Sequence, residues 1–322
     1  MLRKALIFYT RYFTVWVVLF GFVAYFCPAP FLWLGNLQVT ENFSGNSLFF
    51  ALTMFGIGAV LEAADFRRIA QKPWIVVAGC FAQYTIMPFG AFIIAKVFNL
   101  APELTVGLIL TGSAPGAMAS NVMCYVGKAD TAYSVSLTTA STLLCAVLTP
   151  ALTKLLAGSI LPVDAWKLFL DVLWMVVIPL LAGFAIRHYF KTFVERIVYV
   201  FPAISATFIV FVCSFVIAAN REYLAQLTIA VLAAVLVLNL YGMVAGYGVG
   251  AALRMEVKRR RTLAIEIGMQ NAGLGTVLAV KHFGPQAAIP AAIFVFVCII
   301  TASLAAVWWQ KGDSRNIAAK SG

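Results

Sequence analysis

Ten long apolar runs, separated by short polar breaks, are the feature that most constrains how this chain can fold. A membrane-spanning helix needs about 20 mostly apolar residues, and runs of this kind account for most of the 322 residues. With 63% hydrophobic and 11% charged residues, the chain is too apolar for a soluble enzyme or a nucleic-acid-binding module. We predict an all-α membrane protein with ten transmembrane helices. They cover residues 12–27, 46–63, 74–96, 103–127, 130–156, 166–189, 199–219, 224–253, 262–281 and 287–309.

The positively charged residues are divided unequally between the two sides of this arrangement. With the N-terminus placed in the cytoplasm, 18 of the 23 Lys and Arg residues fall on the cytoplasmic side and 5 on the other. Cytoplasmic loops are enriched in Lys and Arg, so the bias predicts an even number of spans with both termini cytoplasmic. It also explains the net charge of +11 without a nucleic-acid partner.

The two ends of the chain need separate interpretation. Arg3 and Lys4 precede the first apolar run, as in a secretory signal peptide. No small-residue cleavage site follows and nine similar runs do, so we interpret this run as a retained first helix. We expect residues 311–322, which are polar, to form a loose cytoplasmic tail.

Sequence patterns of enzymes are absent from the chain. It has no HExxH, no GxSxG and no glycine-rich phosphate loop. The six cysteines stand singly in apolar stretches, without metal-ligand spacing, so we expect no disulfides. We interpret the two histidines, His188 and His282, as solvated surface residues. The sequence predicts a protein that is not an enzyme, and it indicates no obligate protein partner.

The fourth and ninth segments are interrupted by glycines and carry polar residues at mid-depth. The fourth contains Gly112-Ser113-Ala114-Pro115-Gly116 and Ser120-Asn121, and the ninth contains Glu266-Ile267-Gly268-Met269-Gln270-Asn271-Ala272-Gly273. They hold corresponding positions in two halves of five segments, which predicts an inverted repeat with a transport site at the broken helices. Tight helix packing would explain the glycines, but it would not explain the polar cluster.

Glu266 is the acidic residue that we place deepest in the membrane. A carboxylate at that depth costs at least a few kcal/mol, and no Lys or Arg lies at comparable depth. The compensating charge is therefore a bound cation or a proton. The other donors at this depth are oxygen atoms, which hard cations prefer, and a single formal charge favours one or two monovalent ions, Na⁺ first. These donors are Gln83, Ser120, Asn121, Ser134, Thr138, Gln270 and the carbonyls of residues 267–269.

Three stretches resemble the bile acid:sodium symporter family in its bacterial branch. They are residues 119–123 (ASNVM), 132–138 (AYSVSLT) and 266–274 (EIGMQNAGL), with further similarity at 82–83 and 86–88. The resemblance covers almost the whole chain and implies a panel domain (1–73 and 158–222) and a core domain (74–157 and 223–310). Broken helices four and nine would cross in the core, and transport would proceed by alternating access.

The resemblance also implies where ions and substrate bind. One sodium site would use Ser120, Asn121, Ser134, Thr138 and Glu266. A second would use Gln83, Glu266, Gln270 and the backbone oxygens of Ile267 and Met269. The substrate would lie near Asn271, with Met118, Ala119 and Cys298 in its surroundings. Helix N-termini at such a crossing favour an anionic group.

Two departures from the family pattern concern the substrate. Met118 stands where bile-acid-transporting bacterial relatives have a small hydroxyl residue, and Val297-Cys298-Ile299 replaces their Trp-His-Asn. We therefore expect first a small carboxylate of the pantoate or ketopantoate class, with a bile-acid-like anion as the other candidate. The resulting hypothesis is a sodium-coupled symporter for a small organic anion in the bacterial inner membrane. Alternatives are a proton-coupled carrier or antiporter that uses Glu266, and a non-concentrative channel or sensor.

Overall fold

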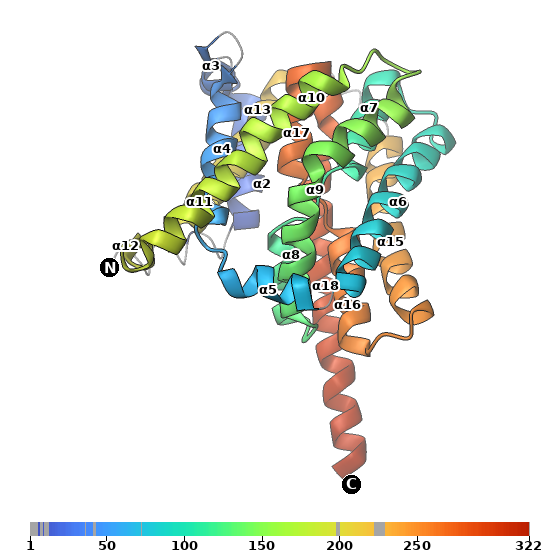
Figure 1. Cartoon of the computed structure of the whole chain (residues 1–322). Coiled ribbons are helices and arrows are strands. Elements are labelled where there is room, and N and C mark those ends of the chain that lie inside the picture. The colour runs from blue at the N-terminus through green and yellow to red at the C-terminus, as the bar shows by residue number, and fades with distance from the viewer. Residues whose placement is uncertain are drawn as a thin grey trace.

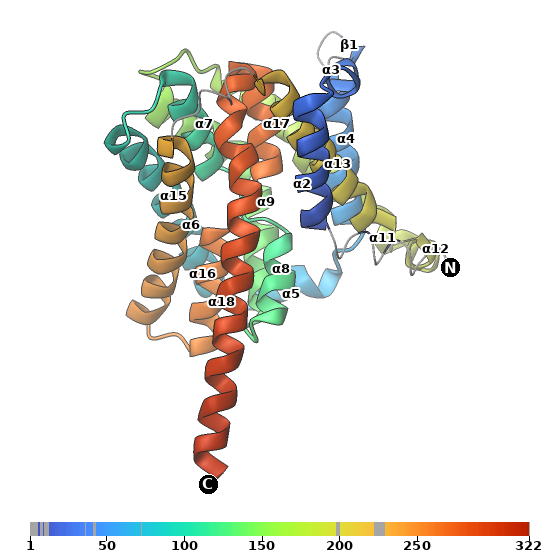
Figure 2. The same ribbon diagram turned by 180° about the vertical axis from the view of Figure 1, so that it is seen from behind.

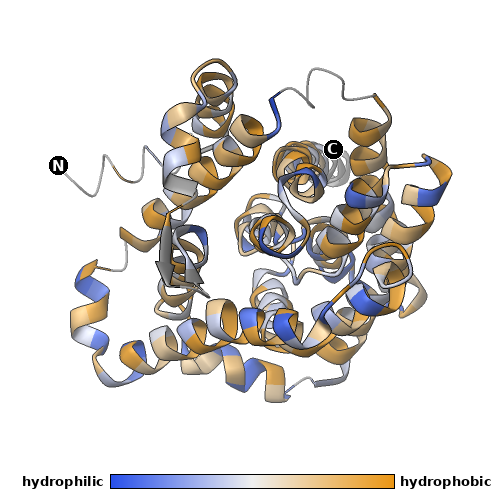
Figure 3. Cartoon of the chain, turned by 90° about the horizontal axis from the view of Figure 1, so that it is seen from above, coloured by the Kyte–Doolittle hydropathy of each residue, from blue (hydrophilic) through white to orange (hydrophobic). Residues whose placement is uncertain are grey.

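The described part of the chain is almost entirely helical. The computed structural model describes Leu6, Tyr9 and residues 13–35, 37–40, 43–71, 73–197, 200–221 and 229–321. One short antiparallel ribbon pairs β1 (Gln38–Thr40) with β2 (Phe43–Ser44). Most of the ribbon diagram is coloured as hydrophobic (Figure 3). The predicted helical membrane fold is thus confirmed at this level.

The helices follow the apolar runs closely. They are α2 (Phe13–Phe26), α3 (Ala29–Gly35), α4 (Gly45–Gly58), α5 (Ala63–Gln71), α6 (Pro73–Val97), α7 (Pro102–Gly112), α8 (Ala119–Val126), α9 (Thr131–Ala157), α10 (Ala165–Val172), the π-helical turn η1 (Leu173–Val177), α11 (Ile178–Tyr189), α12 (Lys191–Ile197), α13 (Phe201–Ala219), α15 (Ile229–Ala252), α16 (Val257–Gly268), α17 (Ala272–Phe283), the 3-10 turn η3 (Pro285–Ala288) and α18 (Ile289–Ser321).

Six continuous helical stretches of the described chain are long and apolar enough to cross a membrane. A seventh is obtained if α4 and α5, which are bent by 75° at their junction, count as one span. The apolar helix α2 and the four helices α7, α8, α16 and α17 are each too short to qualify. Ten spans and an inverted repeat therefore stay predictions.

Three predicted boundaries are corrected by the structure. The second segment ends at Gly58 rather than at residue 63, and α5 turns away as a separate helix that carries Asp65, Arg67 and Arg68. The ninth begins at Val257 rather than at residue 262, because its first residues are good helix formers despite their charge. The expected loose tail continues α18 as helix to Ser321, since its Ala, Lys and Arg residues also favour helix and no proline interrupts it.

Some predictions fall on residues that the structure does not describe. They concern residues 12, 199 and 224–228 of the first, seventh and eighth segments, and the charged residues Arg3, Lys4, Arg11 and Lys72.

The sixth segment, predicted as one continuous helix, contains a π-helical turn. Pro179 has no backbone N–H, so the usual bond to the carbonyl four residues earlier is lost. The Ile178 N–H instead reaches the Leu173 carbonyl, five residues back. The turn, α10 and α11 together form one continuous span, Ala165–Tyr189.

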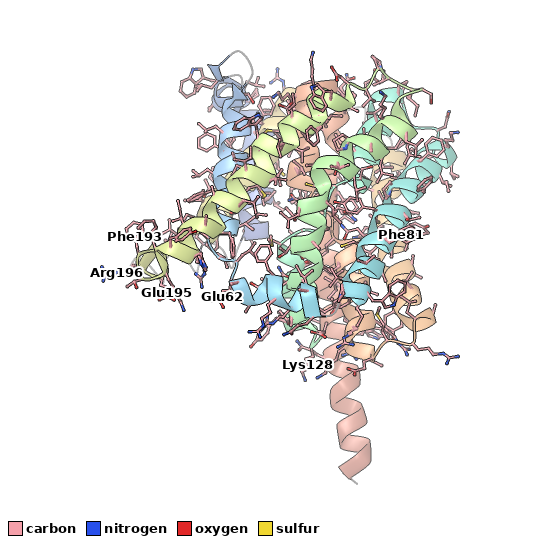
Figure 4. All side chains as sticks on the ribbon, viewed as in Figure 1. Glu62, Phe81, Lys128, Phe193, Glu195 and Arg196 are labelled. Carbon is pink, nitrogen blue, oxygen red and sulfur yellow. The ribbon has the colours of Figure 1, made fainter. Side chains whose placement is uncertain are left out.

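The helices form two groups that lie side by side in Figures 1 and 2. One group packs α13 against α2 and α4, and α4 against α11, and is joined to α10 through η1; the other contains α6–α9 and α15–α18. Contacts between the groups include α9 and α17 against α10, α9 against η1, α17 against α4, and α17 and α18 against α13. Figure 4 labels Phe81, which projects from the middle of α6, and four charged residues that lie below its level: Glu62, Lys128, Glu195 and Arg196.

A cluster of charged side chains joins the two helix groups at the end of the molecule where α10 begins. Asp171 on α10 accepts hydrogen bonds from Lys281 at 2.7 Å and His282 at 2.8 Å, both in the last turn of α17. The three side chains are 17%, 24% and 11% exposed. The prediction that His282 is a solvated surface residue is therefore wrong: it is largely enclosed beside a carboxylate from another segment.

Candidate ion-binding site

Two breaks in the helices form the centre of the candidate site. One separates α7 from α8 between Gly112 and Ala119, and the other separates α16 from α17 between Gly268 and Ala272. The Ala117 N–H donates to the Met269 carbonyl at 2.9 Å, and the Asn271 N–H donates to the Pro115 carbonyl at 2.7 Å. Backbone polar groups at membrane depth need such partners. Each break therefore supplies hydrogen-bond partners for backbone N–H and C=O groups that have no partner within the other break's own helices.

Two continuous helices complete the hydrogen bonding of the breaks. On α9, Ser141 Oγ accepts from the Gly116 N–H at 3.3 Å, and Thr149 Oγ1 donates to the Ser113 carbonyl at 2.6 Å. On α15, Asn239 Nδ2 donates to the Gly268 carbonyl at 2.7 Å. These side chains hold irregular backbone in place among buried residues.

Glu266 lies three residues after Leu263 on α16 and is 0% exposed. Ser120 Oγ donates to its Oε1 at 2.5 Å and Thr138 Oγ1 donates to its Oε2 at 2.9 Å. Ser134 Oγ also donates to Oε1, and its oxygen lies 2.8 Å from Asn121 Oδ1. The four residues around the carboxylate come from the first turn of α8 and, at a spacing of four residues, from one face of α9.

No cation of the protein neutralises Glu266 among the described residues. None of the ion pairs found there includes it. Arg261 is on the same helix, but its guanidinium lies over the Trp309 ring at 5.5 Å. A fully buried carboxylate without a cationic partner is costly. The site is therefore suited to accept a positive charge from outside the chain.

The chemistry of the donor set fits a hard cation. One carboxylate, three hydroxyls and one amide meet at this place, and all of them offer oxygen. Such oxygen ligands suit hard metal ions. No group of three or more His, Cys, Asp or Glu residues that could hold a metal is found in the described ranges.

Gly116 allows the first break to approach the carboxylate. A Cβ atom at this position would lie 2.9 Å from Glu266 Oε2 and 3.6 Å from Gln83 Nε2. A side chain there would enter the space between the two predicted ion sites. Glycine keeps that space available to backbone and ligand.

The residues predicted for a second ion site also meet. Gln83 on α6 and Gln270 in the second break are each 1% exposed, and Gln83 Nε2 donates to Gln270 Oε1 at 3.3 Å. Gln270 Nε2 in turn donates to the Ile267 carbonyl at 3.0 Å. The Met269 carbonyl is engaged by Ala117 but retains a second lone pair.

The predicted substrate residues are placed less uniformly. Asn271 is half-buried and caps α17, where its Oδ1 accepts from the Leu274 N–H at 3.2 Å. Met118 is half-buried and Ala119 exposed at the start of α8. Cys298, by contrast, is 3% exposed, and its thiol donates to the Val295 carbonyl of its own helix. Three of the four residues thus lie at the N-termini that follow the breaks.

Sequence reasoning missed Asn239 and Ser141 as parts of this arrangement. Asn239 is a lone amide between Leu238 and Leu240 in an apolar run. The same signal had singled out Gln83 in the third segment and would have found Asn239. Ser141 has no such signal, because hydroxyls are common in helix packing.

Comparison with known proteins gives consistent matches over this architecture. A family model described as "Sodium Bile acid symporter family" matches residues 47–227. The chain is 39% identical over 310 residues to the sodium-dependent transporter YocS of Bacillus subtilis, covering 96% of this chain and 94% of that protein. It is 36% identical over 306 residues to a probable sodium/metabolite cotransporter, BASS1, of Arabidopsis thaliana, with coverage of 95% and 75%. It is 30% identical over 251 residues to an ileal sodium/bile acid cotransporter of Cricetulus griseus, with coverage of 74% and 70%.

Proposed function

Because the chain belongs to the sodium bile acid symporter family, a family of transporters rather than enzymes, we propose that it imports a small organic anion together with Na⁺. The observation that carries the proposal is the buried Glu266 carboxylate, surrounded by hydroxyl oxygens and paired with no cation of the described residues. The protein would act in a bacterial inner membrane with both termini in the cytoplasm, as the distribution of Lys and Arg favours.

Two sodium ions would bind at the crossing of the breaks. The first would be held by Ser120, Asn121, Ser134, Thr138 and Glu266, whose oxygens already converge. The second would be held by Gln83, Glu266, Gln270 and the carbonyls of Ile267 and Met269. Both ions would share one carboxylate, so binding of each would depend on the same charge.

The anion would bind beside the crossing, near Asn271, Met118 and Ala119, and Cys298 would shape the site through its neighbours on α18. The partial positive charge of the α8 and α17 N-termini supports a carboxylate as the bound group. Met118 and Cys298, in place of the polar residues of bile-acid-transporting bacterial relatives, support a small pantoate- or ketopantoate-like carboxylate over a bile acid. A lipid bilayer and this substrate are the only partners proposed.

Transport would proceed by alternating access between the two helix groups. The group of α2, α4, α10, α11 and α13 would be the panel, and α6–α9 with α15–α18 would be the core. Ion binding would organise the breaks, and the substrate would then bridge core and panel. The inverted five-plus-five repeat is part of this proposal.

Uptake into proteoliposomes at fixed pH tests the function. An inward Na⁺ gradient should drive saturable accumulation of pantoate or ketopantoate, and an equal K⁺ gradient should not. Taurocholate in the same assay tests the choice of substrate class. Accumulation driven by a pH gradient without Na⁺ would instead support a proton carrier that uses Glu266. Uptake that stops when the substrate concentration is equal on both sides of the membrane would support a channel. Substrate binding without uptake would support a sensor.

Gln270 and Asn271 are adjacent in the chain, but we expect Gln270 to bind the ion and Asn271 to bind the substrate. Gln270 is buried against Gln83, whereas Asn271 is half-buried and leads into α17. Asn271→Ala should weaken substrate binding strongly and leave Na⁺ binding nearly intact. Gln270→Ala should weaken Na⁺ binding first, and its effect on substrate should be partly reversed at saturating Na⁺. Ion–substrate coupling of this kind is about 5–150-fold.

Calorimetric titration of Na⁺ and substrate on both variants measures this division. If Asn271→Ala loses Na⁺ affinity as fully as Gln270→Ala, the two residues do not divide the roles. If Asn271 only caps α17, its Ala variant should be less stable whether or not ligand is present.

A further inference from the structure

Helix α15 lies directly against α16 through a seam of glycines. Gly242, Gly246 and Gly250 are spaced by four residues and share one face of α15. Cβ atoms at these positions would lie 3.0 Å from the Ile267 carbonyl oxygen, 2.5 Å from the Leu263 carbonyl oxygen and 3.0 Å from Arg260 Cα. The two backbones are therefore in contact along most of α16.

Asn239 continues this face one turn before Gly242. It is 0% exposed, and its Nδ2 donates to the carbonyl of Gly268, the last residue of α16, at 2.7 Å. Its Oδ1 accepts no hydrogen bond from any residue that the structure describes. Leaving a buried oxygen without a hydrogen bond costs about 1–3 kcal/mol of folding free energy. An apolar side chain at this position would avoid that cost, so the presence of asparagine indicates that its Nδ2 donor has a role.

The bonded carbonyl is placed between two predicted ion ligands. The Gly268 carbonyl and the Met269 N–H belong to one peptide plane, and the backbone oxygens of Ile267 and Met269 flank this plane in the chain. Gly268 lacks a Cβ, so its backbone torsions are the least restricted at this point. Holding its carbonyl removes one source of rotation between the peptide planes and so restricts the directions in which both neighbouring oxygens can point.

We propose that Asn239 is a positioning residue for the second sodium site. It holds the Gly268 peptide plane so that the Ile267 and Met269 carbonyls and the Gln270 side chain converge on the ion. The inference rests on the proposed sodium symport. Residues that orient metal ligands from outside typically change metal affinity by 10–100-fold when they are replaced.

The test is a Na⁺ titration of thermal stability on the purified full-length protein without substrate, with K⁺ keeping ionic strength constant. Asn239→Leu keeps the branching of the side chain, in a larger volume, but has no donor, and we expect it to raise the half-saturating Na⁺ concentration about tenfold. Asn239→Ala should do the same. The matched control is Val235→Ala, one turn earlier on α15 and 0% exposed. It should lower the unfolding temperature in K⁺ but leave the half-saturating Na⁺ concentration unchanged.

An unchanged half-saturating Na⁺ concentration in Asn239→Leu, at any stability, would overturn the inference. If that variant does not fold, Asn239→Ala, which also has no donor, serves in its place, and an unchanged value there would overturn the inference equally. A wild-type protein with no saturable Na⁺ response would instead contradict the proposed function. The two failures are thus distinguishable.

Discussion

Replacing Glu266 by Gln should abolish both the stabilisation of the protein by Na⁺ and Na⁺-driven uptake, while the fold is kept. The amide has nearly the volume of the carboxylate. Its oxygen can accept from one of the hydroxyls of Ser120 and Thr138 and its NH2 can donate to the other, but it removes the only charge proposed for both ions. Removing one partner of a buried charge pair costs roughly 3–5 kcal/mol. The Na⁺ affinity should therefore fall by more than about 100-fold.

The matched control for this experiment is Glu256→Gln, the same substitution at the exposed start of the same helix α16. It should keep the wild-type response to Na⁺ in thermal unfolding and in uptake. A Glu266→Gln protein with wild-type sodium dependence would show that the carboxylate is not the ion ligand. Wild-type uptake that is driven by a pH gradient alone and is lost in Glu266→Gln would point to proton coupling at this residue.

Replacing Asp171 by Asn should loosen the contact between α10 and α17. The carboxylate holds Lys281 and His282 at 2.7 and 2.8 Å, and all three side chains are mostly enclosed. An exposed pair contributes about 0–1 kcal/mol, and breaking a fully buried one costs roughly 3–5 kcal/mol. We expect the free energy of unfolding to fall by about 2 kcal/mol, between these limits, because the cluster is largely but not fully buried.

Hydrogen exchange and thermal unfolding measure this loss. Exchange should rise in α10 and α17 and remain unchanged in α15, which the cluster does not contact. Asp164→Asn is the control: it lies at the start of α10, is 52% exposed, and pairs with Lys167 at 3.8 Å. Because Asn also caps helices well, this change should have little effect. Equal exchange in the wild type and Asp171→Asn would show that the cluster does not hold the two helix groups together.

Apolar runs were sufficient to predict where the helices lie, because lipid forces each run to satisfy its own backbone. The sixth segment, for example, was predicted over 166–189 and is found from Ala165 to Tyr189. The π-helical turn inside it was missed although Pro179 was visible. Proline alone does not predict such a turn, because Pro88 and Pro150 lie inside α6 and α9, which remain α-helical.

The candidate site was predictable in its residues but not in its contacts. Polar side chains are rare at membrane depth, so Glu266, Gln83 and Ser120 could be identified one by one. The pairing of the breaks is set by tertiary packing and leaves no local signal. His282 was misjudged for the same reason, because its partner Asp171 is 111 residues away in the sequence.

The hydrogen bonds that join the two breaks also limit how the sequence can vary. The Ala117–Met269 and Asn271–Pro115 bonds fix the register of one break against the other. Inserting or deleting one residue between 113 and 118 would misalign both bonds and leave backbone groups unsatisfied in the membrane interior, at several kcal/mol each. The lengths of the two interruptions are therefore coupled: a change in one should be tolerated only with a compensating change in the other, about 150 residues away in the chain.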